Sequence, residues 1–137
     1  MSAQNKTSEA PLVSIVDDDI SVRRSTLRLL RSSGLRAEAF ASAEDFLQSG
    51  RVEETACLLL DVSMPGMNGL ELQRRLAEIG RLNPIVFVSA RASEEEEGQA
   101  RQAGASGFLR KPVSKDALLH AIRSALMSPP NYPWKEL

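Results

Sequence analysis

The stretch CLLLD, residues 57–61, consists of four apolar residues followed by one aspartate. A short and continuously apolar run is typical of a strand that is buried on both faces of a parallel sheet. A second run of this kind, IVFV, occupies residues 85–88. Between them, segment 70–80 carries apolar residues at helical spacing and ends in glycine. The order strand, helix, strand predicts two parallel strands joined by a helical crossover.

The same alternation continues in both directions along the chain. Because right-handed crossovers place helices on both faces of such a sheet, we predict a doubly wound α/β domain with a (βα)5 pattern and a five-stranded parallel sheet. Strands are expected at 12–16, 37–40, 57–60, 85–88 and 107–109, and helices at 20–33, 43–49, 70–79, 94–103 and 115–126.

Length and charge limit the possible classes of protein. The chain has 137 residues, which suits one domain. We expect a flexible N-terminal segment at 1–11, the folded domain at 12–127 and a proline-rich C-terminal tail at 128–137. The 17 basic residues nearly balance the 18 acidic ones, which argues against direct binding of nucleic acid.

The expected location is the cytoplasm. No secretory leader is recognisable, and no apolar stretch is long enough to cross a membrane. The single cysteine, Cys57, excludes an internal disulfide and a zinc site made of cysteines, and we expect it to be a small buried apolar residue.

Polar side chains follow four of the predicted strands. Asp17–Asp19 follow the first, Asp61 the third, Ser89 the fourth and Lys111 the fifth. Ligands of open parallel sheets bind outside the carboxyl ends of the strands. We therefore expect these side chains to face a common crevice.

The acidic residues in this crevice indicate a site for a hard cation. Two close carboxylates repel each other unless a cation screens them, and a few carboxylates together with water favour Mg²⁺ over Ca²⁺. Asp17–Asp19 are consecutive and cannot all face one ion, so they do not form a calcium loop. Alternatively, the three are only the acidic start of the next helix. Their combination with Asp61 and Lys111 favours the metal site.

Asp61 is the candidate nucleophile. A carboxylate can attack phosphorus to form an acyl phosphate, and that reaction mainly requires positioning and neutralised charge. Lys111 and Ser89 can each contact a phosphoryl oxygen. Pro112 restricts Lys111 to extended conformations and allows a cis peptide bond.

From about residue 12 to residue 127, the chain resembles the receiver domain of two-component response regulators. Four segments carry the resemblance in order: IVDDD at 15–19, LLLDVSMPGMNGLEL at 58–72, VFVSA at 86–90 and AGASGFLRKP at 103–112. The second of these, with SAEDFL at 42–47, is most similar to the nitrogen-fixation-regulator branch. The resemblance implies a flavodoxin-like sheet with strand order 2-1-3-4-5.

The resemblance also implies roles for individual residues. Asp61 corresponds to the phosphoacceptor and Lys111 to the lysine that contacts the phosphoryl group. Asp18 corresponds to a direct ligand of Mg²⁺, Asp17 to a ligand acting through water, and the backbone carbonyl of Ser63 to a further ligand beside Asp61.

Two further residues correspond to the family's conformational switch. Ser89 matches the switch hydroxyl, where threonine is more usual, and Phe108 matches the switch aromatic. Their movement is expected to change the face formed by the fourth helix, the fifth strand and the fifth helix (α4-β5-α5 in the family's numbering). Ser63 and Arg91 flank the path of an attacking water and are expected to tune the lifetime of the acyl phosphate. Alternatively, Phe108 is an ordinary core aromatic and Arg91 a solvated surface residue.

The expected function is that of a phosphorylation-operated signalling switch. Its partners would be a histidine kinase or phosphotransfer protein, a downstream protein target and, in a homodimer, a second copy bound through the α4-β5-α5 face. Because segment 128–137 is too short for a DNA-binding unit, we expect a stand-alone receiver acting as an adaptor or phosphate sink. The alternatives are the N-terminal receiver of a DNA-binding transcriptional regulator and a pseudo-receiver that works without phosphorylation.

We expect no turnover of a separate substrate. A phosphatase of the haloacid dehalogenase kind also uses an aspartate nucleophile, but it needs a second acid two residues later, where this chain has Ser63. The isolated His120 is expected to be a structural or surface residue rather than a phosphorelay histidine. Gly66 and Gly69 are expected to adopt positive φ and to bend the loop back beside Asp61.

Overall fold

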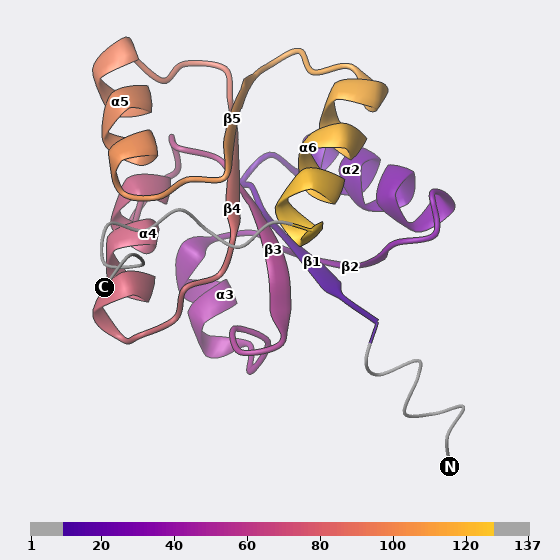
Figure 1. Ribbon diagram of the computed structural model, residues 1–137, viewed down its shortest axis with the longest axis horizontal. Helices are drawn as coiled ribbons and strands as arrows, with labels where there is room; N and C mark the ends of the chain where they lie inside the picture. The colour runs from indigo at the N-terminus through magenta and orange to yellow at the C-terminus, as the bar shows by residue number, and fades with distance from the viewer. Residues whose placement is uncertain (1–9, 128–137) are drawn as a thin grey trace.

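Five parallel strands form one sheet in the order β2-β1-β3-β4-β5, which confirms the predicted doubly wound arrangement (Figure 1). The computed structural model describes residues 10–127, so the predicted tail at 128–137 and most of the predicted N-terminal segment lie outside it. The strands are β1 Leu12–Val16, β2 Arg36–Phe40, β3 Thr55–Leu60, β4 Ile85–Ser89 and β5 Gly107–Arg110. The helices, labelled as in Figure 1, are α2 Ile20–Ser32, α3 Ala43–Gln48, α4 Gly69–Glu78, α5 Glu94–Gln102 and α6 Lys115–Met127.

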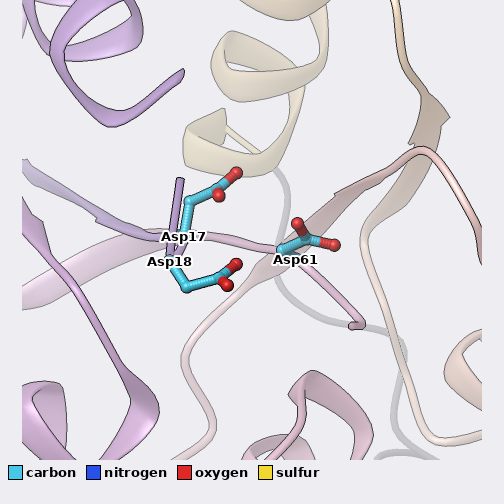
Figure 2. Close-up of side chains that lie close together, drawn as sticks. All are labelled: Asp17, Asp18 and Asp61. Atoms are coloured by element: carbon cyan, nitrogen blue, oxygen red, sulfur yellow. The ribbon is translucent and has the colours of Figure 1, made fainter. Parts of the chain in front are cut away.

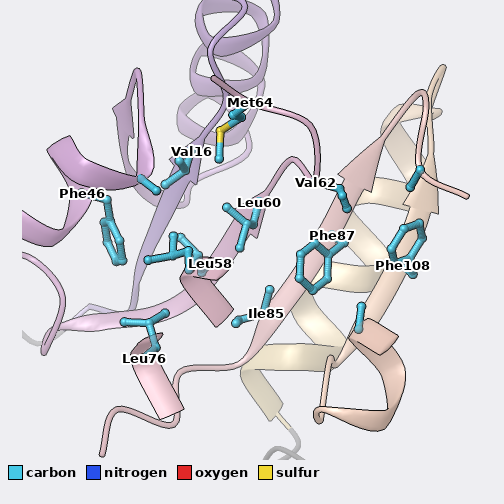
Figure 3. Packing of buried hydrophobic residues seen from close by; sticks show 14 residues of the cluster. Val16, Phe46, Leu58, Leu60, Val62, Met64, Leu76, Ile85, Phe87 and Phe108 are labelled. Atoms are coloured by element: carbon cyan, nitrogen blue, oxygen red, sulfur yellow. The ribbon is translucent and has the colours of Figure 1, made fainter. Parts of the chain in front are cut away.

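Helices cover both faces of the sheet. Helices α2 and α6 lie on one face, and α3, α4 and α5 lie on the other (Figure 1). The side chains of β3 alternate between the two resulting cores: Leu58 and Leu60 belong to the cluster drawn in Figure 3, whereas Cys57 and Leu59 belong to the opposite cluster. This alternation explains why the central strand is apolar at every position from Ala56 to Leu60.

Serine residues directly precede three helices, at the positions where the sequence predicts these helices to begin. The hydroxyl of Ser42 accepts a hydrogen bond from the backbone of Asp45 at the start of α3. Ser93 forms a reciprocal capping box with Glu96 at the start of α5, and Ser114 accepts a hydrogen bond from the backbone of Ala117 in α6. These caps satisfy backbone donors that have no partner inside a helix.

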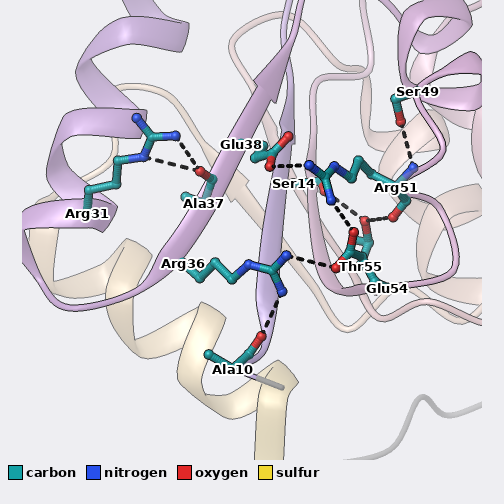
Figure 4. Close-up of polar contacts among 10 residues, drawn as sticks. All are labelled: Ala10, Ser14, Arg31, Arg36, Ala37, Glu38, Ser49, Arg51, Glu54 and Thr55. Carbon is teal, nitrogen blue, oxygen red and sulfur yellow. Dashed lines mark hydrogen bonds and ion pairs between the residues drawn. The ribbon is translucent and has the colours of Figure 1, made fainter. Parts of the chain in front are cut away.

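Strand β3 begins at Thr55, two residues earlier than predicted. Thr55 is polar, but its hydroxyl is buried and hydrogen-bonded to Ser14 Oγ and to the carbonyl of Arg51, each at 2.7 Å. Arg51 also pairs with Glu38 on β2 and with Glu54 (Figure 4). Strand β3 therefore extends into a polar network that the apolar pattern does not reveal.

None of the helices in the described part of the chain has the length and apolarity needed to cross a bilayer.

Candidate functional site

The register of the two central strands places Asp17 next to Asp61. Val16 is paired with Leu60, so the residues that follow them leave the sheet side by side. The backbone N–H of Asp61 donates to the carbonyl of Val16 at 3.1 Å. Two residues that are 44 positions apart in the sequence are thus held at one sheet edge by backbone hydrogen bonds.

Three carboxylates gather at this edge. Asp17, Asp18 and Asp61 each offer an oxygen within 4.8 Å of the oxygens of the other two, and Figure 2 shows the first two extending toward Asp61. Asp17 and Asp61 are buried, whereas Asp18 is exposed. Asp19 instead caps α2 by accepting hydrogen bonds from the backbone of that helix. The interpretation of the acidic triplet as a helix start therefore applies to Asp19 alone.

Lys111 joins the two buried carboxylates. Its Nζ donates to Asp17 Oδ2 at 2.9 Å and to Asp61 Oδ2 at 3.1 Å. Desolvation favours the neutral amine, but the hydrogen bond to Asp17 and the charge of Asp61 outweigh it, so the pKa of Lys111 is raised. The Lys111–Pro112 peptide bond is cis.

Most of the predicted site residues, though neither Asp17 nor Phe108, line one cavity of about 360 Å³. Its lining comprises Asp18, Asp19, Asp61, Ser63, Ser89, Ala90, Arg91 and Lys111. Ser89 is fully buried, and its hydroxyl has no hydrogen-bond partner among the described residues. A buried hydroxyl without a partner is costly, so a ligand oxygen in this cavity would satisfy it.

The donor set fits the predicted Mg²⁺ ion. Every side-chain ligand is a carboxylate oxygen, which suits a hard cation. Both oxygens of Asp17 already accept hydrogen bonds, from Lys111 and from the backbone of Asp19. The carboxylate of Asp18 makes no hydrogen bond or ion pair within residues 10–127. This difference agrees with a direct role for Asp18 and an indirect one for Asp17.

The loop after Asp61 is shaped by two glycines in different ways. Gly66 has a φ of +71°, as expected, whereas Gly69 does not have positive φ, so that prediction is wrong. Gly69 is required by proximity instead, because a Cβ there would lie 2.3 Å from the carbonyl oxygen of Asp61. The same loop places the backbone N–H of Ser63 3.2 Å from Asp61 Oδ1.

Of the predicted switch and lifetime residues, Ser89, Ser63 and Arg91 line this cavity, whereas Phe108 lies in the core. Phe108 is 7% exposed and stacks on Phe87, with 5.6 Å between ring centroids. It is therefore a core aromatic in this conformation, and its switching role stays a prediction. Arg91 is exposed and lines the cavity, and His120 is exposed on α6.

Two arginines make contacts near the site that the sequence motifs do not indicate. Arg23 Nη1 donates to the backbone carbonyl of Asp17 at 2.9 Å. Arg110, directly before Lys111, donates to the carbonyl of Ala92 in the loop after β4. Its position next to Lys111 in the sequence indicates that Arg110 lies near the site. The sequence does not indicate that its side chain reaches the loop after β4.

The fold, together with the three carboxylates and the lysine at the carboxyl edge of the sheet, places this chain in a class of α/β proteins, those that resemble response regulators. Residues 13–123 match the response regulator receiver domain, and the chain therefore belongs to this family. It is a receiver domain of two-component signalling. Receiver domains of response regulators interact with histidine kinases or phosphotransfer proteins.

Relatives and solved structures agree with this assignment. The chain is 42% identical to the response regulator protein TmoT of Ectopseudomonas mendocina, over 93% of the chain and 58% of that protein. The structure of response regulator StyR matches 85% of the chain and 59% of its own, with 46% identity and a TM-score of 0.79. The structure of FixJ-N matches 85% of the chain and 93% of its own, with 30% identity and a TM-score of 0.77. The chain thus spans little more than half the length of curated relatives such as TmoT.

Proposed function

We propose that this receiver domain is a phosphorylation-operated switch in which Asp61 accepts a phosphoryl group from a histidine kinase or phosphotransfer protein, with Mg²⁺ as cofactor. One observation supports this most directly: Lys111 Nζ bridges Asp61 and Asp17 beside a third carboxylate, in a cavity open to a donor. We further propose that the switch operates in the cytoplasm.

The carboxylate of Asp61 is the nucleophile in the proposed reaction. Its oxygen attacks phosphorus as the bond from phosphorus to the donor's imidazole nitrogen breaks, which gives an acyl phosphate on Asp61 and a neutral donor histidine. Lys111, which already contacts Asp61 Oδ2, neutralises charge on the transferred group. The unpartnered hydroxyl of Ser89 donates to another phosphoryl oxygen.

Asp18, Asp61 and the carbonyl of Ser63 would hold Mg²⁺, with Asp17 acting through water. The ion, when bound, supplies positive charge that lowers the repulsion between these carboxylates and the incoming phosphoryl group. Asp17 contributes by orienting Lys111 through a hydrogen bond of 2.9 Å.

The acyl phosphate is later lost to water. Ser63 and Arg91 line the cavity beside Asp61, and we propose that they tune access of the attacking water. Since no other substrate is needed for this cycle, we propose that the domain is not an enzyme with separate turnover.

The proposed output is a change in the face formed by α5, β5 and α6, which is the α4-β5-α5 face of the family's numbering. Ser89 moves toward the phosphoryl group and Phe108 changes its packing, which alters the surface offered to a downstream protein or to a second copy in a homodimer. Ser89 and Phe108 lie on the paired strands β4 and β5, so the two movements would affect adjacent strands of the sheet.

Intact-mass measurement after incubation with acetyl phosphate and Mg²⁺ tests the proposal. We expect the mass of one phosphoryl group on the wild-type protein and none on Asp61→Asn. Asp45→Asn removes an exposed carboxylate from α3 and serves as the matched control, which should be phosphorylated like the wild type. Equal uptake by Asp61→Asn would place the site elsewhere, and no uptake by the wild type would favour a pseudo-receiver.

Two molecular settings are candidates for this switch. The first is a stand-alone adaptor or phosphate sink. The second is the N-terminal receiver of a DNA-binding regulator, and it is favoured by the chain covering 54% of the transcriptional regulatory protein FixJ of Azorhizobium caulinodans. An immunoblot of source cells with an antibody against this domain separates them, because a band at 15.0 kDa supports the first and a band about twice as heavy the second.

A further inference from the structure

Arg110 connects strand β5 to the loop that follows β4. Its Nη1 donates to the backbone carbonyl of Ala92 at 2.5 Å, and its Nη2 donates to Glu97 Oε1 at 2.8 Å. The guanidinium carbon also lies 5.4 Å from the ring centroid of Phe108. One side chain therefore contacts the loop, the start of α5 and the predicted switch aromatic.

The loop held by Arg110 begins at the predicted switch hydroxyl. Ser89 is the last residue of β4 and is paired with Arg110 across the sheet. Residues 90–93 lead from Ser89 to α5 and include Arg91, which lines the cavity. The backbone N–H of Lys111 donates to the carbonyl of Ser89 at 3.0 Å, and the side chain of Arg110 bonds to Ala92, so two successive residues hold this short segment on both sides of Arg91.

Any movement of the loop toward Asp61 must therefore stretch or break the hydrogen bond between Arg110 and the carbonyl of Ala92. The hydrogen bond to the carbonyl of Ala92 comes from a charged donor, and such bonds are stronger than neutral ones. Ala92 is itself 6% exposed and packs in the core, so its carbonyl cannot shift without disturbing apolar contacts. The buried hydroxyl of Ser89 has no partner among the described residues, which leaves it able to turn toward a new acceptor.

We propose that Arg110 is a positioning residue that holds the loop after Ser89 in the arrangement of the unphosphorylated domain, and so sets how readily phosphorylation moves it. This inference rests on the proposed function and adds a regulatory element to it. Arg110 stabilises one of two loop arrangements, and the acyl phosphate on Asp61 favours the other by offering an acceptor to Ser89.

A simple surface ion pair is the competing explanation. The side chains of Arg110 and Glu97 are 41% and 27% exposed, and exposed ion pairs contribute little to stability. Glu97 also pairs with Arg101 on its own helix, at 3.0 Å. Among residues 10–127, the hydrogen bonds of the Arg101 side chain go to Glu97 and not to the loop or β5, so its removal is a matched control for the loss of charge next to Glu97.

The test compares backbone amide NMR spectra with and without beryllofluoride and Mg²⁺, a mimic of the acyl phosphate. Arg110→Met retains apolar contact with Phe108 but removes both hydrogen bonds. Without beryllofluoride, we expect the chemical shifts of the amides at 90–93 in this variant to lie partway toward the values seen with beryllofluoride. The population of the activated loop arrangement relative to the unphosphorylated one should rise about tenfold. Arg101→Met should match the wild type.

The outcomes separate the inference from the proposed function. If the wild type responds to beryllofluoride and Arg110→Met remains at the wild-type positions without it, the inference is wrong while the switch stands. Equal shifts in Arg110→Met and Arg101→Met would also overturn it, because charge alone would then explain the effect. A wild type without any response overturns both. Arg110→Gln, which keeps one donor group on a shorter side chain, gives a second variant if the first does not fold, and its loop should shift in the same direction.

Discussion

Replacing Gly69 with alanine should damage both the stability and the phosphorylation of the domain. An alanine Cβ at this position would lie 2.3 Å from the carbonyl oxygen of Asp61, and 3.0 Å from both the carbonyl carbon of Asp61 and the Cα of Val62. All three atoms belong to the backbone, so no flexible side chain can move aside. Either α4 or the end of β3 must shift, which should lower the free energy of unfolding by about 1–3 kcal/mol.

The matched control is Gly98→Ala. Gly98 lies inside α5, and apart from the backbone of its own helix no heavy atom of the described residues lies within 4 Å of the place its Cβ would occupy. Because alanine is a better helix former than glycine, this variant should gain about 1 kcal/mol of stability. The two substitutions are chemically identical and should change stability in opposite directions.

Urea unfolding followed by circular dichroism measures the stability change, and the initial rate of acetyl phosphate uptake measures the effect on the site. We expect the midpoint of Gly69→Ala to fall and its rate to drop severalfold, since the residue pressed upon is the proposed nucleophile Asp61. This prediction is wrong if the free energy of unfolding of Gly69→Ala is within about 0.5 kcal/mol of the wild-type value and the variant accepts phosphate at the wild-type rate. The close approach of α4 to Asp61 would then not constrain the site.

Two other predictions concern titratable groups. Burial raises the pKa of Cys57 to about 12. The thiol should therefore resist a disulfide reagent at pH 8 in the folded protein and react fully in urea. Rapid reaction in the folded state would contradict its burial. The pKa of Lys111 is raised in the folded state, so its contribution to stability should be complete below its unfolded pKa and be lost as the pH rises through the folded value. Lys111→Met should therefore be less stable than the wild type by about 1–2 kcal/mol at pH 7, and the difference should shrink above about pH 11. A difference that grows with pH in parallel urea titrations would show that the protonated amine of Lys111 is not the source of the stabilisation.

Most of the fold could be predicted because its signals are local. The apolar runs at 57–60 and 85–88 lie within observed strands, and the helices predicted to begin at 43 and 94 begin there, each after a serine cap. The early start of β3 could not be predicted, since Thr55 is polar and its hydroxyl finds buried partners only after β1 has packed beside it.

The grouping of the site residues could be predicted, but their interactions could not. The strand ends indicated that Asp17, Asp61 and Lys111 share one edge. The structure adds that Lys111 bridges both carboxylates and that Asp18, unlike Asp17, has no partner among the described residues. These facts depend on side-chain conformations, which the order of residues does not specify.

By itself, the sequence determined the type and order of the strands and helices, because hydrogen bonding within a helix and the alternation of apolar residues act over a few positions. It also determined which polar residues follow each strand. Only the tertiary structure decided that Lys111 lies 2.9 Å from Asp17, 94 residues away, that Gly69 is needed for proximity rather than for its φ, and that Arg110 reaches the loop after Ser89. These contacts join distant segments, and their geometry follows from how strands and helices pack rather than from local preference.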